Sequence, residues 1–478
     1  MRSKQIHKKL LVLLFFILLL LTAGSTFVSA ACHVVTPSGS GSQSGADWNN
    51  AFADIPATLT RGDTYYIATG TYPHHRFNTP ESGTALITIK KAIATDHCTD
   101  VGWNNATMGV GQAVWTTTGG QEIWQFLNNG FWVLDGNGRT DRKSGHGFKL
   151  DNSNVSAATR NVLHIQTSPG TPLNNFTFRY IEVQGAGTRS NTDHGGPINF
   201  SEHNVDFGGI TNNILFEYGY IHDSSNIPVQ LSGSLGQSGR AHDITFQYTT
   251  IARDASGSSF HGNGFYDQGN YDNITFRYGV LEDLEGTAWM GSNVAGGTTT
   301  NYAIYGNVFV VHSGNPHGVT GIGNGAIAIY NAKTVNGFFV YNNSFVNLQP
   351  NSSRVYIGPE VTVSNVQIRN NLWYNTADAS HGPNTTGMTA SHNYYINTPF
   401  NISLETDVQT AAGSPLVDWV NENFHLSAPT IGGLTLSAPY NIDPDGSTRG
   451  AGGLWNRGAY EFLSLSRPAP PTNLRLVP

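Results

Sequence analysis

The chain has 478 residues and a formal net charge of −7, with 25 Lys and Arg against 32 Asp and Glu. This acidic balance argues against a general nucleic-acid binder, because the phosphate backbone is bound through Lys and Arg. The 55 glycines and the low charged content of 12% favour many short strands joined by turns, with little helix.

Residues 1–30 have the pattern of a secretory signal peptide. A basic start is followed by an apolar run over 10–21 and by the small-residue sequence Val28-Ser29-Ala30, which fits a cleavage site. The apolar run is too short to favour a membrane span, and no later segment is long enough for one. We therefore expect a protein without a membrane span that is secreted to the extracellular space, the periplasm or the cell surface.

Residues 31–130 are interpreted as an N-terminal cap and the first coils of a repeat protein, with a short capping helix near 50–60. The two cysteines of the chain, Cys32 and Cys98, both fall in this segment. In an exported protein they form either one disulfide or two buried thiols, and both alternatives stay open.

A short sequence pattern of alternating apolar and polar residues, here called the phrase, recurs through residues 131–400. Its first apolar column is Phe176, Ile214, Ile244, Ile274, Tyr302, Phe338 and Val366, at intervals of 38, 30, 30, 28, 36 and 28. A second column, two residues on, is Phe178, Phe216, Phe246, Phe276, Ile304, Val340 and Ile368. A third column, seven residues on from the first, is Ile221, Ile251, Leu281, Phe309, Phe345 and Trp373. Period-two alternation of this kind predicts pairs of short strands with one buried face.

One such unit cannot bury its apolar face alone, whereas stacked units can. A period near 30 with three short strands per coil predicts a single-stranded parallel β-helix, an all-β solenoid. A leucine-rich horseshoe would need a leucine spacing that is missing, and a propeller would need a longer period. Asn307, Asn343 and Asn371 lie in the turn between the second and third columns, where stacked Asn side chains can bond along the stack.

The repeat weakens after residue 400. Residues 401–463 are interpreted as irregular C-terminal coils, and residues 464–478 as a Pro-rich tail or linker.

Three stretches resemble secreted right-handed parallel β-helix proteins related to pectate lyases and chondroitinase B-type lyases. They are DWNNAFADIPATLTRGDTYYIATGTY (47–72), SGTALITIKKA (82–92) and DPDGSTRGAGGLWNRGAYEF (443–462). The resemblance covers nearly the whole mature chain and implies a right-handed parallel β-helix. The matching stretches are specific for this architecture, but they say little about which reaction the protein catalyses.

A third strand is expected before each phrase, with outward side chains that line a groove along the stack. The predicted outward row is Lys149, Asn199, Gln230, Tyr266, Trp289, Ala328 and Tyr356. Planar side chains beside amides suit sugar rings, whose faces stack while their hydroxyls are hydrogen-bonded. The alternative is that these aromatic residues are covered by loops as a satellite core.

The phrase ends in Asp223, Asp254 and Asp283, which we expect to stack along one edge of the groove. Stacked carboxylates repel unless Arg253, a shared proton or a bound Ca²⁺ offsets the repulsion. His203 and His261 lie close by in the sequence and join Arg253, Asp254 and Asp283 as candidate catalytic residues. The alternative is that an Asp at a strand end caps a turn.

Three functions fit this pattern. A polysaccharide lyase would use a base and a cation, from Arg or a tentative Ca²⁺ on the Asp column, to cleave a uronate-containing polysaccharide by β-elimination. A glycoside hydrolase would use paired Asp residues on neighbouring coils. A non-catalytic adhesin or sugar-binding protein would use the same surface without chemistry. We expect a monomer with a polysaccharide ligand and no cofactor besides the possible Ca²⁺.

Overall fold

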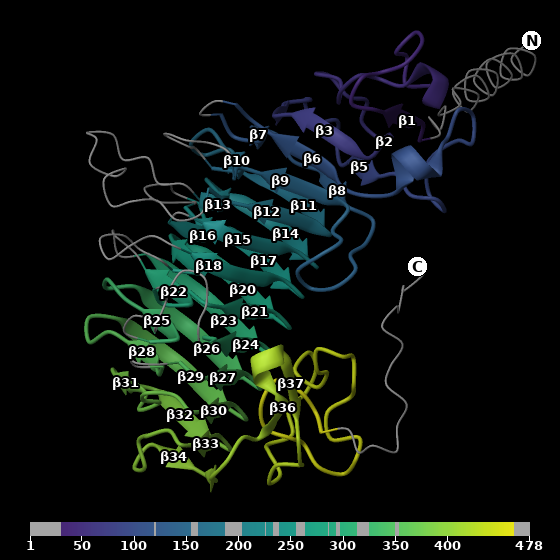
Figure 1. Cartoon of the computed structure of the whole chain (residues 1–478). Helices are drawn as coiled ribbons and strands as arrows, with labels where there is room; N and C mark the ends of the chain where they lie inside the picture. Colours follow the sequence, from purple (N-terminus) through teal and green to yellow (C-terminus); the bar gives the residue numbers. More distant parts are fainter. Residues whose placement is uncertain are drawn as a thin grey trace, which may run out of the picture. The chain divides into compact units, whose positions relative to one another are not determined.

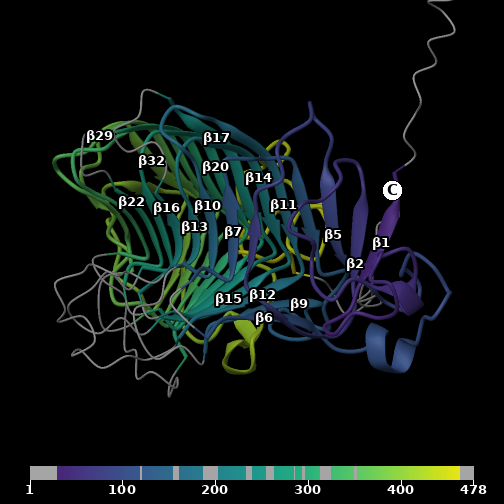
Figure 2. The same ribbon diagram turned by 90° about the horizontal axis from the view of Figure 1, so that it is seen from above.

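The computed structural model describes residues 30–118, 121–153, 161–186, 203–224, 226–232, 239–254, 263–284, 286–292, 297–312, 325–348 and 353–462. The chain divides into a short N-terminal unit, Met1–Ala31, and a body, Cys32–Pro478. In the body, short strands of successive coils lie edge to edge and form long parallel sheets (Figure 1). Seen from above, these sheets are the walls around one interior (Figure 2).

Sheet A has 13 strands within the described ranges. In spatial order they are β1 (Cys32–Val35), β2 (Thr64–Ile67), β5 (Ile87–Lys91), β8 (Trp132–Asp135), β11 (Leu173–Arg179), β14 (Thr211–Glu217), β17 (Ala241–Gln247), β20 (Tyr271–Arg277), β23 (Thr298–Tyr305), β26 (Thr334–Tyr341), β29 (Thr362–Arg369), β32 (Met388–Ser391) and β34 (Glu405–Thr406). The first two predicted apolar columns lie in this sheet in register, which confirms the alignment of the repeat.

Sheet B has 12 strands in the described part of the chain. They are β3 (Gly70–Pro73), β6 (Ala113–Thr116), β9 (Phe148–Asp151), β12 (Ile181–Gln184), β15 (Tyr220–Ser224), β18 (Thr250–Asp254), β21 (Val280–Glu282), β24 (Val308–Val310), β27 (Ser344–Val346), β30 (Leu372–Tyr374), β33 (Tyr394–Ile396) and β35 (Gln409–Ala411). The third predicted column lies here, again in register.

Sheet C has 10 strands among the residues described. They are β4 (His75–Phe77), β7 (Trp124–Leu127), β10 (Leu163–Gln166), β13 (His203–Phe207), β16 (Ile227–Leu231), β19 (Phe265–Gln268), β22 (Trp289–Ser292), β25 (Ile327–Ile329), β28 (Val355–Ile357) and β31 (Gly382–Pro383). Within the described residues, neighbouring strands of sheets A, B and C pair in parallel, for example β16 with β19 and β19 with β22. The chain is therefore an all-β parallel β-helix.

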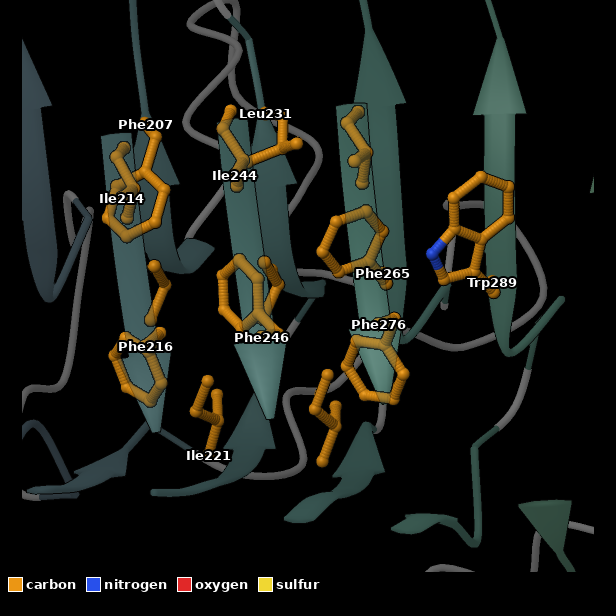
Figure 3. Packing of buried hydrophobic residues seen from close by; sticks show 14 of the residues in the cluster. Phe207, Ile214, Phe216, Ile221, Leu231, Ile244, Phe246, Phe265, Phe276 and Trp289 are labelled. Carbon is orange, nitrogen blue, oxygen red and sulfur yellow. The ribbon is translucent and has the colours of Figure 1, made fainter. Parts of the chain in front are cut away.

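The interior is one continuous apolar core that runs the length of the stack. Phe178, Phe216, Phe246 and Phe276 contribute one column of rings, with neighbouring centroids 5.3–6.3 Å apart. Figure 3 shows Phe216, Phe246 and Phe276 on successive strands, with Trp289 in the same interior. Each buried Phe contributes about 1.5–3 kcal/mol of transfer free energy, so stacking of the coils provides the stability that one coil lacks.

An asparagine ladder runs through the turn between sheets A and B, as the sequence predicts. Asn307 Nδ2 donates to Asn343 Oδ1 at 3.0 Å, and Asn343 Nδ2 donates to Asn371 Oδ1 at 3.0 Å. Asn371 continues the ladder to Asn393 at 3.2 Å. All four side chains are completely buried, so these bonds satisfy amides that water cannot reach.

Replacement of Asn343 by Ala is expected to lower the free energy of unfolding by about 2–4 kcal/mol, since it leaves several buried polar groups unpaired. Besides its two ladder contacts, the Asn343 amide donates to the Ile304 carbonyl at 2.9 Å. The same substitution at the exposed Asn336 is the control and should cost less than about 1 kcal/mol. Urea unfolding of both variants measures the difference, and equal costs would contradict a role of the ladder in stability.

The N-terminal coils differ from the prediction in one respect. The expected helix near 50–60 does not form: a 3₁₀ turn, η1 (Trp48–Asn50), is followed by bends and one isolated bridge. Pro56 has no backbone N–H to donate to a helical hydrogen bond. Ile55 and Leu59 are buried in the core as separate residues and not as one face of a helix. A π-helical turn, η2 (Asn105–Gly109), follows further along. Cys32 and Cys98 form a disulfide, so of the two alternatives the cross-link is the one present.

Beyond β35 the chain is irregular. A two-stranded antiparallel sheet, β36 (Leu416–Asp418) and β37 (Asn423–Leu426), flanks a 3₁₀ turn, η3 (Trp419–Asn421), and lies beside the C-terminal coils (Figure 1). The loop before β9 reaches this segment. Arg142 contacts Glu282 and Glu422 at 2.7 Å, and Lys143 contacts the same two carboxylates. The loop thus fastens an early coil to a later coil and to the C-terminal segment. No helix in the described residues is long and apolar enough to cross a membrane.

Candidate functional site

The outward-facing residues of sheet C form one row along the stack, here called the outer row. Its members in register are Arg76, Gln125, His164, Asp206, Gln230, Tyr266, Met290, Ala328 and Tyr356. Their neighbours on either side in the strands, such as Val205, Phe265 and Ile327, belong to the core. Because coils lie about 4.8 Å apart, the row presents one side chain per coil to a long ligand.

A histidine between two carboxylates is the main chemical feature of the outer row. His164 Nδ1 lies 3.5 Å from Glu122 Oε1, and His164 Nε2 lies 4.0 Å from Asp206 Oδ2. Asp206 is held in place by Ser232 Oγ at 2.6 Å and by Asn161 Nδ2 at 2.9 Å. The side chains of Glu122, His164 and Asp206 keep 11%, 15% and 9% of their surface exposed, so the imidazole is sheltered yet reachable. Such a group can accept and return a proton.

Amide and guanidinium groups extend the row on either side. The exposed Arg76 donates through Nε to Gln125 Oε1 at 2.6 Å, and Gln125 Nε2 donates to Gln166 Oε1 at 3.1 Å. Gln230 Nε2 donates to Gln268 Oε1 at 3.3 Å. A cation, amides and an imidazole therefore follow one another on neighbouring coils.

Three predicted ligand-binding residues, Gln230, Tyr266 and Tyr356, do lie on the outer row. Tyr356 is half-buried and stacks on Tyr330 with ring centroids 4.8 Å apart. Tyr266 is only 3% exposed and packs with Ile227 and Met290. The satellite-core alternative thus describes Tyr266, whereas Tyr356 keeps an accessible face.

The prediction that Trp289 faces outward is wrong. Trp289 pairs with Phe265 and Ile327, both core residues, and its side chain is fully buried. The ring lies 5.6 Å from Phe265 and points into the interior with it (Figure 3). Its neighbour Met290 occupies the outward position. The predicted strand was out of register by one residue, which exchanges the two faces of a strand.

Lys149 faces outward, but from β9 of sheet B and not from the outer row. Its ammonium lies 3.0 Å from Glu182 Oε1. Asn199 and His261 lie outside the described residues. His203 begins β13, and its side chain is not described.

The three aspartates do not form a column. Ser224 pairs with Asp254 and Ala252 pairs with Glu282, so Arg253 stands level with Asp223 on one side and Asp283 on the other. These three residues have positive φ values of 52°, 50° and 53°, which turn the chain out of sheet B. Asp254 lies one place further on, and its side chain is not described.

The arginine neutralises its neighbour directly. Arg253 donates to both carboxylate oxygens of Asp223, at 2.8 and 3.0 Å. Asp283 is bound instead by the backbone N–H and the imidazole of His312, at 2.7 and 3.2 Å. Asp223 is therefore committed to an ion pair with Arg253, and Asp283 to its contacts with His312. Across the described ranges no group of three or more His, Cys, Asp or Glu residues is arranged to hold a metal ion.

A polar cluster covers the outer face of sheet B around these residues. Glu182 accepts hydrogen bonds from Gln112 at 2.8 Å and contacts Lys149, while His222 lies between Glu182 and Asp223 at 3.4 and 2.6 Å. Burial alone would raise the pKa of Glu182, but the bonds from His222 and Gln112 and the Lys149 charge lower it to about 2. His146, which is completely buried, has its ring 6.2 Å from that of Tyr220.

We expect this region to make the protein sensitive to acid. Burial, with Arg139 nearby, lowers the pKa of His146 to about 4, whereas the unfolded chain titrates near 6.5. The unfolded state then binds more protons between these values, so stability is lost as the pH falls from 6.5 to 4, by roughly 3 kcal/mol. The depressed pKa of Glu182 has the same sign, with its loss between pH 4.5 and 2.

Urea unfolding at pH 7.5, 5.5 and 4 measures this slope. His146→Phe should reduce the slope by about half and not abolish it, because burial also lowers the pKa of His75 to about 4. An unchanged slope in the variant would contradict a neutral, buried His146.

The sequence prediction missed the residues Arg76, Glu122, His164 and Asp206. A signal was present, since LHIQ (163–166) and NVDF (204–207) alternate apolar and polar residues before the phrase. The distance from this strand to the first apolar column varies, however: Val205 precedes Ile214 by 9 residues, whereas Val229 precedes Ile244 by 15. A turn of variable length hides the register of the strand before it.

Neither a protein-family model nor a curated protein matches this sequence. Among solved structures, 13 chains match. Pectate lyase Pel9A has a TM-score of 0.53 at 12% identity, covering 92% of this chain and 98% of its own. XylC in complex with xylose has a TM-score of 0.37 at 10% identity, covering 81% and 87%. A mannuronic acid specific family 6 lyase from human gut microbiota has a TM-score of 0.30 at 12% identity, covering 82% and 85%. At these identities the likeness to Pel9A establishes the parallel β-helix fold, as the sequence resemblance implied.

Proposed function

We propose that the chain is a carbohydrate-active enzyme exported from the cell, a polysaccharide lyase that cleaves a uronate-containing polysaccharide by β-elimination along the outer row. The observation that carries the proposal is the succession of Arg76, Gln125, His164 and Asp206 on neighbouring strands of one sheet. A guanidinium, an amide, an imidazole and a carboxylate at the spacing of the coils match the repeated charges and hydroxyls of such a polymer. The Cys32–Cys98 disulfide supports an oxidising location.

In this mechanism His164 removes the proton on the carbon next to the uronate carboxylate. The electron pair of that C–H bond forms the new double bond, the bond from the adjacent carbon to the glycosidic oxygen breaks, and that oxygen takes up the proton that the His164 imidazolium returns. Asp206 and Glu122 flank the imidazole, one near each ring nitrogen. Arg76, two strands away in the row, binds a carboxylate of the polymer and holds it in register.

A hydrolase is the second candidate, because Glu122 and Asp206 are two carboxylates on either side of one position. A hydrolase needs one carboxyl group as acid and another as base or nucleophile. The two reactions differ in product: elimination leaves an unsaturated uronate that absorbs in the ultraviolet, whereas hydrolysis does not.

The deciding experiment incubates the purified chain with a panel of uronate-containing and neutral polysaccharides. Ultraviolet absorbance and reducing ends are recorded together, with Ca²⁺ and then with a chelator. A rise in both signals supports the lyase, and reducing ends alone support the hydrolase. Binding without either product would replace both with the sugar-binding scaffold. Loss of activity on chelation would support a bound metal ion, such as the Ca²⁺ expected from the sequence.

A further inference from the structure

A lysine and an aspartate meet inside the apolar core of the β-helix. Lys333 Nζ lies 2.9 Å from Asp267 Oδ2 and 3.1 Å from Asp267 Oδ1, and neither side chain has any exposed surface. Asp267 lies in β19 on the inner face of sheet C, and Lys333 directly precedes β26 of sheet A. The contact therefore crosses the interior between two sheets and two different coils.

Aromatic rings enclose this pair. Lys333 Nζ lies 6.0 Å from the ring centroid of Tyr271 and 5.8 Å from that of Tyr302. The Tyr302 hydroxyl donates a hydrogen bond to Asp267 Oδ2, and the indole of Trp289 packs edge-on against the Tyr302 ring with centroids 4.7 Å apart. Gly291 leaves the space for this arrangement, because a Cβ there would meet Tyr302 Oη at 3.0 Å.

We propose that Lys333 Nζ and Asp267 Cγ are joined by an isopeptide bond, formed by the folded chain itself. The amine lone pair attacks the carboxyl carbon, the C–N bond forms, and one C–O bond of the carboxyl group breaks. The departing oxygen leaves as water, carrying the hydroxyl proton of the neutral acid and one proton of the amine. The reaction needs no oxidant, metal or second reactant. The Tyr302 hydroxyl donates a hydrogen bond to the Asp267 carboxyl oxygen and so polarises the carboxyl group for attack.

Burial shifts both groups toward their neutral forms. Desolvation raises the pKa of Asp267 to about 6 and lowers the pKa of Lys333, despite the attraction of each group for the other. A neutral acid and a neutral amine held in contact react far faster than the same groups in solution, because the entropic cost of their encounter is already met. An apolar enclosure also keeps out the water that would reverse the reaction.

The bond would brace the structure behind the outer row. It would tie β19 to the start of β26, closing a loop of the chain from 267 to 333. Tyr266, which neighbours Asp267, faces outward on the outer row. A covalent tie at this point would hold that part of the row even when individual coils open.

Mass spectrometry of the purified full chain tests the proposal. After reduction, denaturation and trypsin, an unmodified chain yields the separate peptides 254–277, 278–333 and 334–354. With the isopeptide bond, peptide 254–277 should remain attached to 278–354, because trypsin does not cleave after a lysine whose amine is acylated. The joined species should be lighter by one water molecule than the sum of peptides 254–277 and 278–354. Fragmentation should place the junction on Lys333 and Asp267.

Two controls keep the outcome unambiguous. Lys149 contacts Glu182 at 3.0 Å but is partly exposed, so trypsin should cleave after it normally in the same digest. Lys333→Met removes the amine while keeping an unbranched apolar chain, and the joined species should disappear. Even if that variant fails to fold, the wild-type digest decides: peptides 254–277 and 278–333 found separately at their full masses would overturn the proposal and leave a buried ion pair.

Discussion

Replacement of Trp289 by Ala should strongly destabilise the fold and not merely weaken the binding of sugar. The indole is fully buried between Phe265, Tyr302 and Phe338, with ring centroids 4.7–6.3 Å away. Its removal leaves a large cavity that the surrounding side chains cannot move in to fill. Trp→Ala at such positions lowers the free energy of unfolding by about 3–5 kcal/mol. We therefore expect a marked drop in the urea midpoint and a low yield of folded protein.

The matched control is Trp419→Ala. Trp419 is half-buried in the C-terminal segment and packs at the edge of a smaller apolar cluster. The same change of side chain there should cost at most about 2 kcal/mol, since part of the indole already contacts water. A Trp289→Ala protein that unfolds like the wild type, yet loses binding of oligosaccharide, would restore the outward orientation that the sequence suggested.

Replacement of His164 by Ala should abolish activity on the polysaccharide that the panel identifies, while the fold remains. His164 sits between Glu122 and Asp206 at 3.5 and 4.0 Å and keeps 15% of its side chain exposed. Loss of a general base lowers kcat by about 100- to 10,000-fold. The imidazole lies outside the apolar core, so its removal should disturb the packing of the coils little. The measurement is kcat and KM together with thermal unfolding.

His242→Ala is the matched control, because His242 also pairs with a carboxylate, Asp243, at 2.7 Å. It lies on sheet A with 43% of its side chain exposed, away from the outer row. Activity should change less than about twofold there, as surface ion pairs contribute little. Equal activity of the His164→Ala variant and the wild type would place the chemistry elsewhere.

The fold could be predicted from the sequence because its cause is local. Columns such as Ile214, Ile244 and Ile274 alternate with polar residues at a nearly constant period, and the structure places them in register. The Asn307–Asn343–Asn371 ladder follows from the same alignment. In each case one coil repeats the burial pattern of the preceding coil, so counting residues along the repeat is enough to predict which side chains stack.

Part of the site could also have been read more accurately from the sequence. Asp223 and Asp283 both lie nine residues after their first apolar residue, Ile214 and Ile274, whereas Asp254 lies ten after Ile244. The ninth place on the middle coil is Arg253. Strict counting gives the alternation of acid and base that the structure contains.

The sequence by itself determined the repeat, the inward faces of sheets A and B, and the polar turns between them. Only the tertiary structure decided which strand precedes each phrase, and so which side chains share the outer row. The turn between sheets C and A differs in length from coil to coil, and a change of one residue turns Trp289 inward and Met290 outward. The contacts of His164 with Asp206, and of Lys333 with Asp267, join residues 42 and 66 positions apart. These contacts form only when the intervening coils have folded and brought distant residues together, and no local sequence pattern predicts them.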